Sequence, residues 1–282
     1  MLSDVKSTLP SDRPLIMGVL NITPDSFSDG GCFFDRSRAV ERALEMVEEG
    51  ADIVDVGGES TRPGSEGVSL EQELERVVPV IGEIASRTTV RISVDTTRAR
   101  VAAEAISAGA GVVNDVSMLR GDEGFAAEVA GAGADLVIMH SRKTPRDMQE
   151  EIRYGDVVND VRDELMAAVE RAVGGGVGKD RIWIDPGIGF AKTAGQNLEL
   201  MARLEELVAL GYPVLVGPSR KSFIGAYTGA PVDRREGGTA AAVALSVANG
   251  ARAVRVHDVA VMRQAAIIAH EISRAVRGGE GA

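Results

Sequence analysis

Polar side chains of matching chemistry follow short apolar runs at several points in the sequence. Asp95, Asn114 and Asp185 each stand at the end of such a run and supply carboxylate or amide oxygens. These oxygens suit a planar heterocycle that presents several N–H donors, and each charge-assisted bond to it is worth about 1.5–3 kcal/mol. Lys221 follows another apolar run. The four side chains can act on one small molecule if the fold brings their strand ends together.

A second group of residues is cationic. Arg255 and His257 stand two apart on an expected strand and therefore point to the same side, while Arg62 follows the second apolar run. In a protein of net charge −11, this cationic corner suits an anionic group, and guanidinium pairs with phosphate through two parallel hydrogen bonds. The sequence has no Ser–His–Asp order, close Cys–His pair or HExxH motif. Nucleophilic and zinc-dependent hydrolysis are therefore poorly supported.

Each of these residues also has a purely structural explanation. Asp95 could cap a helix that begins near Thr97, and Asp115 is better explained as a cap or turn residue. His140 fits a hydrogen-bonded interior histidine better than a catalyst. What favours a site is the joint placement of seven polar residues at strand ends. These are Asn21, Asp95, Asn114, Asp185, Lys221, Arg255 and His257.

The elements that must position these residues alternate along the whole chain. Runs typical of buried strands cover 15–20, 52–56, 91–94, 111–114, 136–139, 181–184, 214–216 and 253–256. Amphipathic helical patterns cover 37–49, 70–86, 98–108, 123–132, 156–173, 194–210, 234–249 and 259–276. Eight strand–helix units in 282 residues predict one α/β domain, a single (β/α)8 TIM barrel over 1–282 with its core at about 14–276. A doubly wound parallel sheet is the alternative.

Long loops are expected after the first and second strands. The stretch 20–31, LNITPDSFSDGG, is longer than a connector needs and holds turn residues around one ring, Phe27. We expect a barrel with mobile loops after strands 1 and 2, the first of which closes over the site when substrate is present. Asn21 would stay at the rigid barrel rim beneath it.

Composition excludes several classes of partner. A net charge of −11 repels nucleic acid and anionic membrane surfaces, so we expect neither as a partner. No apolar run reaches the roughly 18 residues of a membrane-spanning helix. One cysteine, Cys32, excludes an internal disulfide framework, and a reducing cytoplasm is the simplest location.

The sequence resembles the dihydropteroate synthases over about 14–276. The resemblance is carried, in order, by 21–31, 55–64, 93–96, 114–116, 185–190, 217–222 and 255–258. It implies a transferase of folate biosynthesis that condenses p-aminobenzoate with 6-hydroxymethyl-7,8-dihydropterin pyrophosphate, giving 7,8-dihydropteroate and pyrophosphate. It also implies Mg²⁺ dependence and a homodimer joined through the last helices.

The resemblance assigns roles to matching positions. Pterin binding falls to Asp95, Asn114, Asp185 and Lys221. Pyrophosphate binding falls to Arg62, Arg255, His257 and Asn21, the last through the metal ion. The p-aminobenzoate pocket, where sulfonamides act in this family, falls to Thr61, Pro63, Phe190, Lys221 and Ser222. The catalytic candidates are Asp95, Lys221, Arg255 and His257.

The chemistry of these residues predicts an SN1-like reaction. The arylamine of p-aminobenzoate is neutral at pH 7 and needs no strong base, so the barrier lies in breaking the bond to pyrophosphate. Cations can stabilise the leaving group, and carboxylates the positive charge left on the pterin. Two alternatives are a non-catalytic pterin-binding homologue and a corrinoid-linked pterin methyltransferase. The latter has no pyrophosphate to release and is not expected to keep the first-loop and 219–222 patterns.

Overall fold

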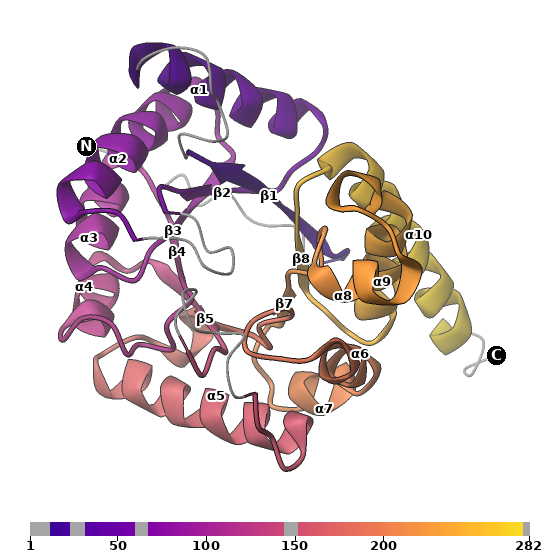
Figure 1. Cartoon of the computed structure of the whole chain (residues 1–282). Coiled ribbons are helices and arrows are strands. Elements are labelled where there is room, and N and C mark those ends of the chain that lie inside the picture. Colours follow the sequence, from indigo (N-terminus) through magenta and orange to yellow (C-terminus); the bar gives the residue numbers. More distant parts are fainter. Residues whose placement is uncertain (1–11, 23–31, 60–66, 144–151, 279–282) are drawn as a thin grey trace.

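The computed structural model describes residues 12–22, 32–59, 67–143 and 152–278. Parallel strands form a ring in the order β6-β5-β4-β3-β2-β1-β8-β7, and the helices surround it (Figure 1). The strands are β1 (Leu15–Asn21), β2 (Ile53–Gly57), β3 (Arg91–Asp95), β4 (Val112–Asp115), β5 (Asp135–Met139), β6 (Ile182–Asp185), β7 (Leu215–Val216) and β8 (Ala253–Val256). The weakest seam lies between β6 and the short β7, where Ile184 and Val214 form a single bridge. The predicted TIM barrel is confirmed.

The helices pack around the ring in chain order. They are α1 (Cys32–Glu48), α2 (Leu70–Arg87), α3 (Ala99–Ala108), α4 (Phe125–Ala132), α5 (Val157–Gly174), α6 (Ala194–Ala202), α7 (Leu204–Val208), α8 (Ser222–Thr228), α9 (Glu236–Ala248) and α10 (Val259–Gly278). Ser69 and Thr193 begin α2 and α6 with capping boxes, and the Asp156 carboxylate caps α5. In the part of the chain that the structure describes, no helix has the length and apolar character to cross a membrane.

Two predicted boundaries are wrong. The predicted helix 194–210 is two helices, interrupted at Arg203. Its apolar pattern could not reveal the break, because Leu200, Leu204 and Leu207 are all buried across it. Helix α8 was not predicted, since it is only seven residues long and lies in the connection between the seventh strand and the predicted helix at 234–249. The loops predicted to be mobile fall on 23–31 and 60–66, which lie outside the described residues.

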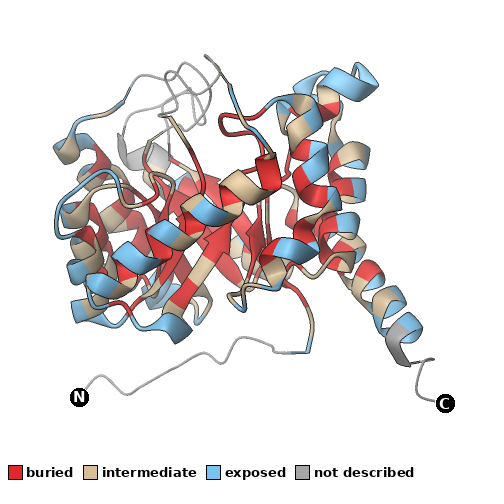
Figure 2. Cartoon of the chain, turned by 90° about the horizontal axis from the view of Figure 1, so that it is seen from below, coloured by how far each residue is buried: buried red, intermediate tan, exposed pale blue. Residues whose placement is uncertain are grey.

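Two sets of buried side chains hold the barrel together. The larger lies between the outer face of the strands and the helices, and most strand residues are buried (Figure 2). The smaller, which we call the lower layer, lies inside the barrel. It consists of Leu15, Met17, Ile53, Val112, Val137, Leu215 and Ala253, with Trp183 packed against them. Because side chains alternate along a strand, the next interior positions lie two residues further on.

Candidate active site

A pocket lies at the C-terminal ends of the strands and opens to solvent; the empty space there is about 320 Å³ with the open solvent at its mouth included. Its polar lining is Asp95, Asn114, Asp185, Lys221 and Arg255. Its apolar lining is Val116, Met139, Ile188, Phe190 and Gly217. The structure thus brings together five of the strand-end residues singled out in the sequence, together with Phe190. Their convergence follows from the parallel strands, whose carboxyl ends meet at one end of a barrel.

Arg255 joins two buried carboxylates at the base of this pocket. Its Nε donates to Asp55 Oδ2 at 2.6 Å and its Nη2 to Asp95 Oδ2 at 2.9 Å. The Asn114 amide also donates to Asp55 Oδ2, at 3.2 Å. Burial raises the pKa of Asp95 to about 7; the Arg255 charge opposes this shift, and Asp55 adds to it. The base of the pocket therefore holds more carboxylate than its guanidinium can balance.

Asp185 and Lys221 form another part of the pocket lining. Burial raises the pKa of Asp185 to about 6, although it accepts the Gly187 N–H at 2.7 Å and lies near the Lys221 charge. Burial, together with the nearby Arg255 charge, lowers the pKa of Lys221 to about 8. The Lys221 ammonium stands 4.0 Å from the centre of the Phe190 ring, a cation–π contact. An ammonium group and an aromatic face thus lie side by side at the pocket.

The predicted cationic corner of Arg255 and His257 needs correction. Arg255 faces two carboxylates, so most of its charge is already balanced. His257 lies beyond the end of β8 and outside the pocket lining, and burial lowers its pKa to about 4, so it is neutral at pH 7. Its backbone N–H and ring Nδ1 both lie at hydrogen-bonding distance from Ser219 Oγ, at 3.2 and 3.0 Å. The spacing of Arg255 and His257 did not reveal their charge, because burial and the neighbouring carboxylates decide it.

The other predicted residues occupy several environments. Asn21 ends β1 half-buried at the rim, and Ser222 is exposed at the start of α8. Asp115 is a turn residue as predicted, accepting the N–H groups of Ser117 and Leu119. His140 is an interior, hydrogen-bonded histidine as predicted, with none of its surface exposed. Thr61, Arg62 and Pro63 lie outside the described residues.

Several known proteins are similar to this chain in both sequence and fold. Residues 17–257 match the family described as pterin binding enzyme. The dihydropteroate synthase of Synechocystis sp. is 47% identical over 93% of this chain and 91% of its own. The chain belongs to the dihydropteroate synthase family. The family's Yersinia pestis enzyme, crystallised with a sulfonamide drug, superposes with a TM-score of 0.87 at 40% identity over 96% of both chains. The Xanthomonas albilineans enzyme, in complex with 7,8-dihydropteroate, gives 0.82 at 40% identity over 94% of both.

Two functional candidates of this dihydropteroate synthase family member escaped the sequence analysis. Asp55 is the one charged residue inside the apolar run of β2, and its Oδ1 is buried without a hydrogen bond in the described part of the chain. Lys192 follows Phe190 by two residues and is almost fully buried. A charge between strand residues was a usable signal for Asp55. Nothing in the local pattern marks Lys192 as buried.

The donor set at the rim is compatible with a magnesium ion held mainly by a phosphate ligand. The Asn21 amide oxygen and the Asp95 side chain both lie beside Gly57, since both approach within 4 Å of where a Gly57 side chain would begin. Mg²⁺ prefers oxygen ligands and often binds through one or two protein groups together with substrate phosphates. Within 12–22, 32–59, 67–143 and 152–278, no three His, Cys, Asp or Glu side chains form a metal cluster. A substrate-bound ion needs no such cluster.

Proposed function

We propose that the protein condenses p-aminobenzoate with 6-hydroxymethyl-7,8-dihydropterin pyrophosphate to form 7,8-dihydropteroate and pyrophosphate. The observation that carries this proposal is the single pocket that joins buried carboxylates, Lys221 and the Phe190 ring. The similar X. albilineans enzyme has been crystallised with 7,8-dihydropteroate, which contains both halves of the proposed product. The two parts of the pocket suit the two halves of this product, since one part is rich in carboxylates and the other holds an aromatic ring.

The carboxylate-rich part is assigned to the pterin. Asp95 and Asp185 can accept hydrogen bonds from the ring N–H groups, and the Asn114 side chain can pair with a ring carbonyl or nitrogen. Buried carboxylates bind such a ring strongly because few competing waters reach them. Lys221, between Asp185 and Phe190, would lie over the pterin edge and reach both substrates. We assign Phe190, exposed Ser222, and the undescribed Thr61 and Pro63 to p-aminobenzoate.

The leaving pyrophosphate is assigned to the rim. Arg255 Nη1 has no hydrogen-bond partner within the described residues, so it remains available as a donor. The ring of neutral His257 can donate from Nε2 while Nδ1 accepts the Ser219 hydroxyl, and Arg62 would complete the set. Asn21 would hold Mg²⁺ together with the pyrophosphate, and the bound ion would supply charge stabilisation to the leaving group.

The order of bond changes follows from the charges. The bond between the pterin methylene and the pyrophosphate oxygen breaks first, leaving positive charge that Asp95 and Asp185 stabilise. The amine nitrogen of p-aminobenzoate then forms the new bond and loses a proton to solvent. Positional isotope exchange within the pyrophosphate, measured without p-aminobenzoate, tests this order. A bond-breaking rate that depends strongly on the nucleophile would contradict it.

One assay tests the reaction as a whole. Purified protein is supplied with the pterin pyrophosphate, and pyrophosphate release is measured with and without p-aminobenzoate and Mg²⁺. We expect release only when both are present. No release with intact substrate refutes the proposal and favours a non-catalytic pterin-binding protein. Release followed by inhibition with a sulfonamide would extend to this chain the ligand class that was crystallised with the Y. pestis relative.

We also propose that two copies of the chain pair through the last helices. Ile268, Ile272 and Val276 stand four residues apart along one stripe of α10, and each is about 60% exposed. Leu245 on the neighbouring α9 is equally exposed. An apolar area of this kind on a soluble enzyme marks an interface. Sedimentation should give a dimer that Ile268→Glu with Ile272→Glu converts to monomer, whereas Leu198→Glu on α6 should leave it dimeric.

A further inference from the structure

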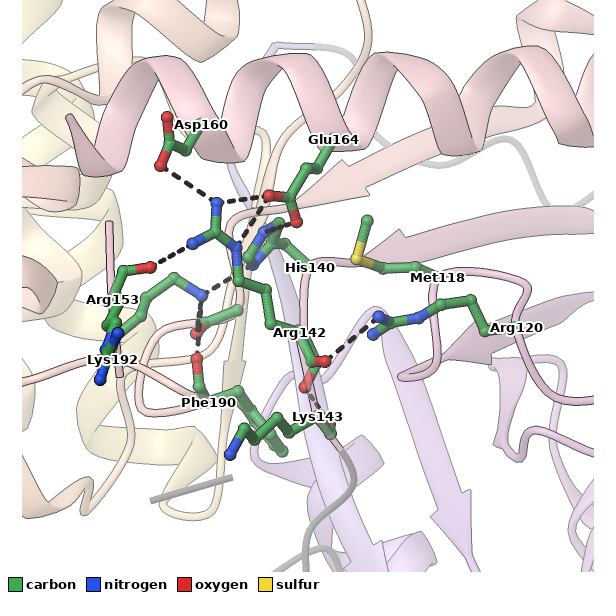
Figure 3. Close-up of polar contacts among 12 residues, drawn as sticks. Met118, Arg120, His140, Arg142, Lys143, Arg153, Asp160, Glu164, Phe190 and Lys192 are labelled. Atoms are coloured by element: carbon green, nitrogen blue, oxygen red, sulfur yellow. Dashed lines mark hydrogen bonds and ion pairs between the residues drawn. The ribbon is translucent and has the colours of Figure 1, made fainter. Parts of the chain in front are cut away.

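A polar network lies behind the pocket wall and does not touch the pocket; its Lys192 and His140 are buried, whereas its Glu164 and Arg142 are each about one-third exposed. It consists of Lys192, His140, Glu164 and Arg142, which we call the Lys192 network (Figure 3). Lys192 Nζ lies 2.9 Å from His140 Nδ1, and His140 Nε2 lies 3.1 Å from Glu164 Oε2. Arg142 Nε donates to Glu164 Oε1 at 2.8 Å. Lys192 is only 3% exposed, so burying it carries a cost that some gain must offset.

The geometry fixes the direction of each hydrogen bond. Lys192 Nζ meets three acceptors, which are His140 Nδ1, the Gly187 carbonyl at 3.1 Å and the Phe190 carbonyl at 3.0 Å. Burial lowers the pKa of Lys192 to about 7, but the three acceptors favour the ammonium form, which has three N–H donors and satisfies all of them, whereas a neutral amine would leave one acceptor unpaired. Burial lowers the pKa of His140 to about 4, so the ring stays neutral and donates from Nε2 to Glu164. Lys192 is thus a three-way donor.

The two carbonyls belong to the ends of one turn. The Phe190 N–H donates to the Gly187 carbonyl at 3.0 Å, which closes the turn 187–190. Gly187 and Gly189 both have positive φ, +67° and +84°, so the turn depends on glycine. Lys192 reaches both ends of this turn from behind, while Ile188 and Phe190 line the pocket in front. The ammonium therefore fixes the backbone from which the pocket wall projects.

The turn is also packed tightly on both sides. A Cβ at Gly187 would lie 1.9 Å from the His140 carbonyl oxygen, and a Cβ at Gly189 would lie 2.8 Å from Lys221 Cδ. The Gly189 N–H donates to Asn197 Oδ1 at 2.6 Å. A shift of this backbone would therefore move the Phe190 ring, which belongs to the turn. Precise placement of one aromatic face needs such support from behind.

We propose that Lys192 is a positioning residue that holds Phe190 in place and thereby sets the affinity for p-aminobenzoate. This inference rests on the proposed function, because Phe190 is assigned there to the p-aminobenzoate pocket. Lys192 acts through the turn backbone and contacts neither substrate. The far members of its network, Glu164 and Arg142, keep the His140 ring oriented to accept from it.

Steady-state kinetics of Lys192→Met tests the proposal. Methionine has similar length but no donor. We expect KM for p-aminobenzoate to rise about tenfold, or ~1.4 kcal/mol, while kcat and KM for the pterin pyrophosphate change less than about twofold. Lys179→Met, at an exposed lysine in the short 3-10 helix before β6, is the matched control and should leave all three values unchanged. Unchanged KM for p-aminobenzoate in a folded Lys192→Met protein overturns the proposal.

A double-mutant cycle separates positioning from general loosening. Phe190→Ala alone should raise the same KM, and adding Lys192→Met should raise it by less than about twofold more, because the ring through which Lys192 acts is gone. Fully additive effects overturn the proposal.

Glu164→Gln gives the answer if Lys192→Met does not fold, since Glu164 is about one-third exposed and tolerates change. We expect about a threefold rise in KM for p-aminobenzoate, because the His140 ring loses its charged acceptor. No rise counts against the network. Wild-type protein that releases no pyrophosphate overturns the proposed function and this inference with it, whereas an active wild type with unaltered variants overturns only the inference.

Discussion

The interior of the barrel has two levels with opposite chemistry on the same strands. The lower layer is apolar, and on five strands the pocket lining begins two residues further along the chain. The pairs are Val112 and Asn114, Val137 and Met139, Trp183 and Asp185, Leu215 and Gly217, and Ala253 and Arg255. Both levels share the same backbone geometry, so fold alone does not explain the difference. One level fills space, and the other leaves a pocket lined with buried charge.

The difference shows where stability and activity are located. The lower layer stabilises the folded state, because it removes apolar surface from water and packs closely. The upper level holds Asp95, Asp185 and Lys221 in surroundings that shift the pKa of each toward its neutral form. Such surroundings destabilise the free protein and strengthen binding of a ligand that supplies the missing partners. The two levels should therefore respond oppositely to substitution.

The largest effect is expected at the upper level. Lys221→Ala removes the ammonium between Asp185 and Phe190, and kcat/KM should fall by about 10²- to 10³-fold because no other cation replaces it there. The thermal midpoint should stay within a few degrees, because the side chain fills little of the core. Lys179→Ala serves as the exposed control. Near-normal kinetics would remove Lys221 from the site.

The lower layer should show the reverse pattern. Leu215→Ala creates a cavity beneath the pocket at a fully buried position, and the free energy of unfolding should drop by about 2–5 kcal/mol. At 25 °C the folded fraction should keep kcat within a few-fold of wild type, since Gly217 and the pocket lie one level above. Urea unfolding and kinetics on the same sample measure both quantities. A loss of kcat as large as that of Lys221→Ala would show that the levels are not separable.

Much of this division could be predicted from the sequence, because parallel strands place their carboxyl ends together. Asp95, Asn114 and Asp185 each end an apolar run, and each lies in the pocket. The resemblance to dihydropteroate synthases added Phe190. Strand periodicity also explains Asp55, which stands two residues after Ile53 and should have been recognised as an interior charge.

The remaining features depend on contacts between residues far apart in the chain. Arg255 meets Asp55 across 200 residues, so its charge balance is not visible locally. His257 was predicted to be cationic because burial cannot be deduced from one strand. Lys192 owes its position to His140, 52 residues earlier. The sequence predicts at which level of the barrel a titratable side chain lies. The pKa of that side chain depends on all of its neighbours in the folded protein.

The stability cost of the upper level can be measured with Asp95→Asn. The pKa of Asp95 is raised to about 7 in the folded protein against about 3.9 unfolded, so the folded state binds more protons between these values. Its contribution to stability is therefore present below pH 4 and is lost as the pH rises to 7. Asparagine does not titrate, and it still accepts a hydrogen bond from Arg255.

We compare the free energy of unfolding of Asp95→Asn with that of wild type at the same pH. The difference, variant minus wild type, should be larger at pH 7.5 than at pH 5 by on the order of 2 kcal/mol. Urea unfolding at both pH values gives this difference and cancels the titration of other groups. Asp180→Asn, at an exposed aspartate, should show none. If the difference in the free energy of unfolding between Asp95→Asn and wild type does not change with pH, then burial does not raise the pKa of Asp95.

The smallest effect is the pH profile of activity, which tests the same charges in the working enzyme. Binding and charge stabilisation need Asp95 and Asp185 ionised, and their pKa values are about 7 and 6, so kcat/KM for the pterin pyrophosphate should rise through pH 6–7. The Lys221 ammonium, with a pKa of about 8, should be lost above that pH, and kcat/KM should then fall by up to about tenfold per pH unit. Lys221→Arg keeps a cation at all these pH values, so it should lose the alkaline limb while keeping the acidic one. An alkaline limb that survives this substitution would assign it to another group and separate the Lys221 charge from catalysis.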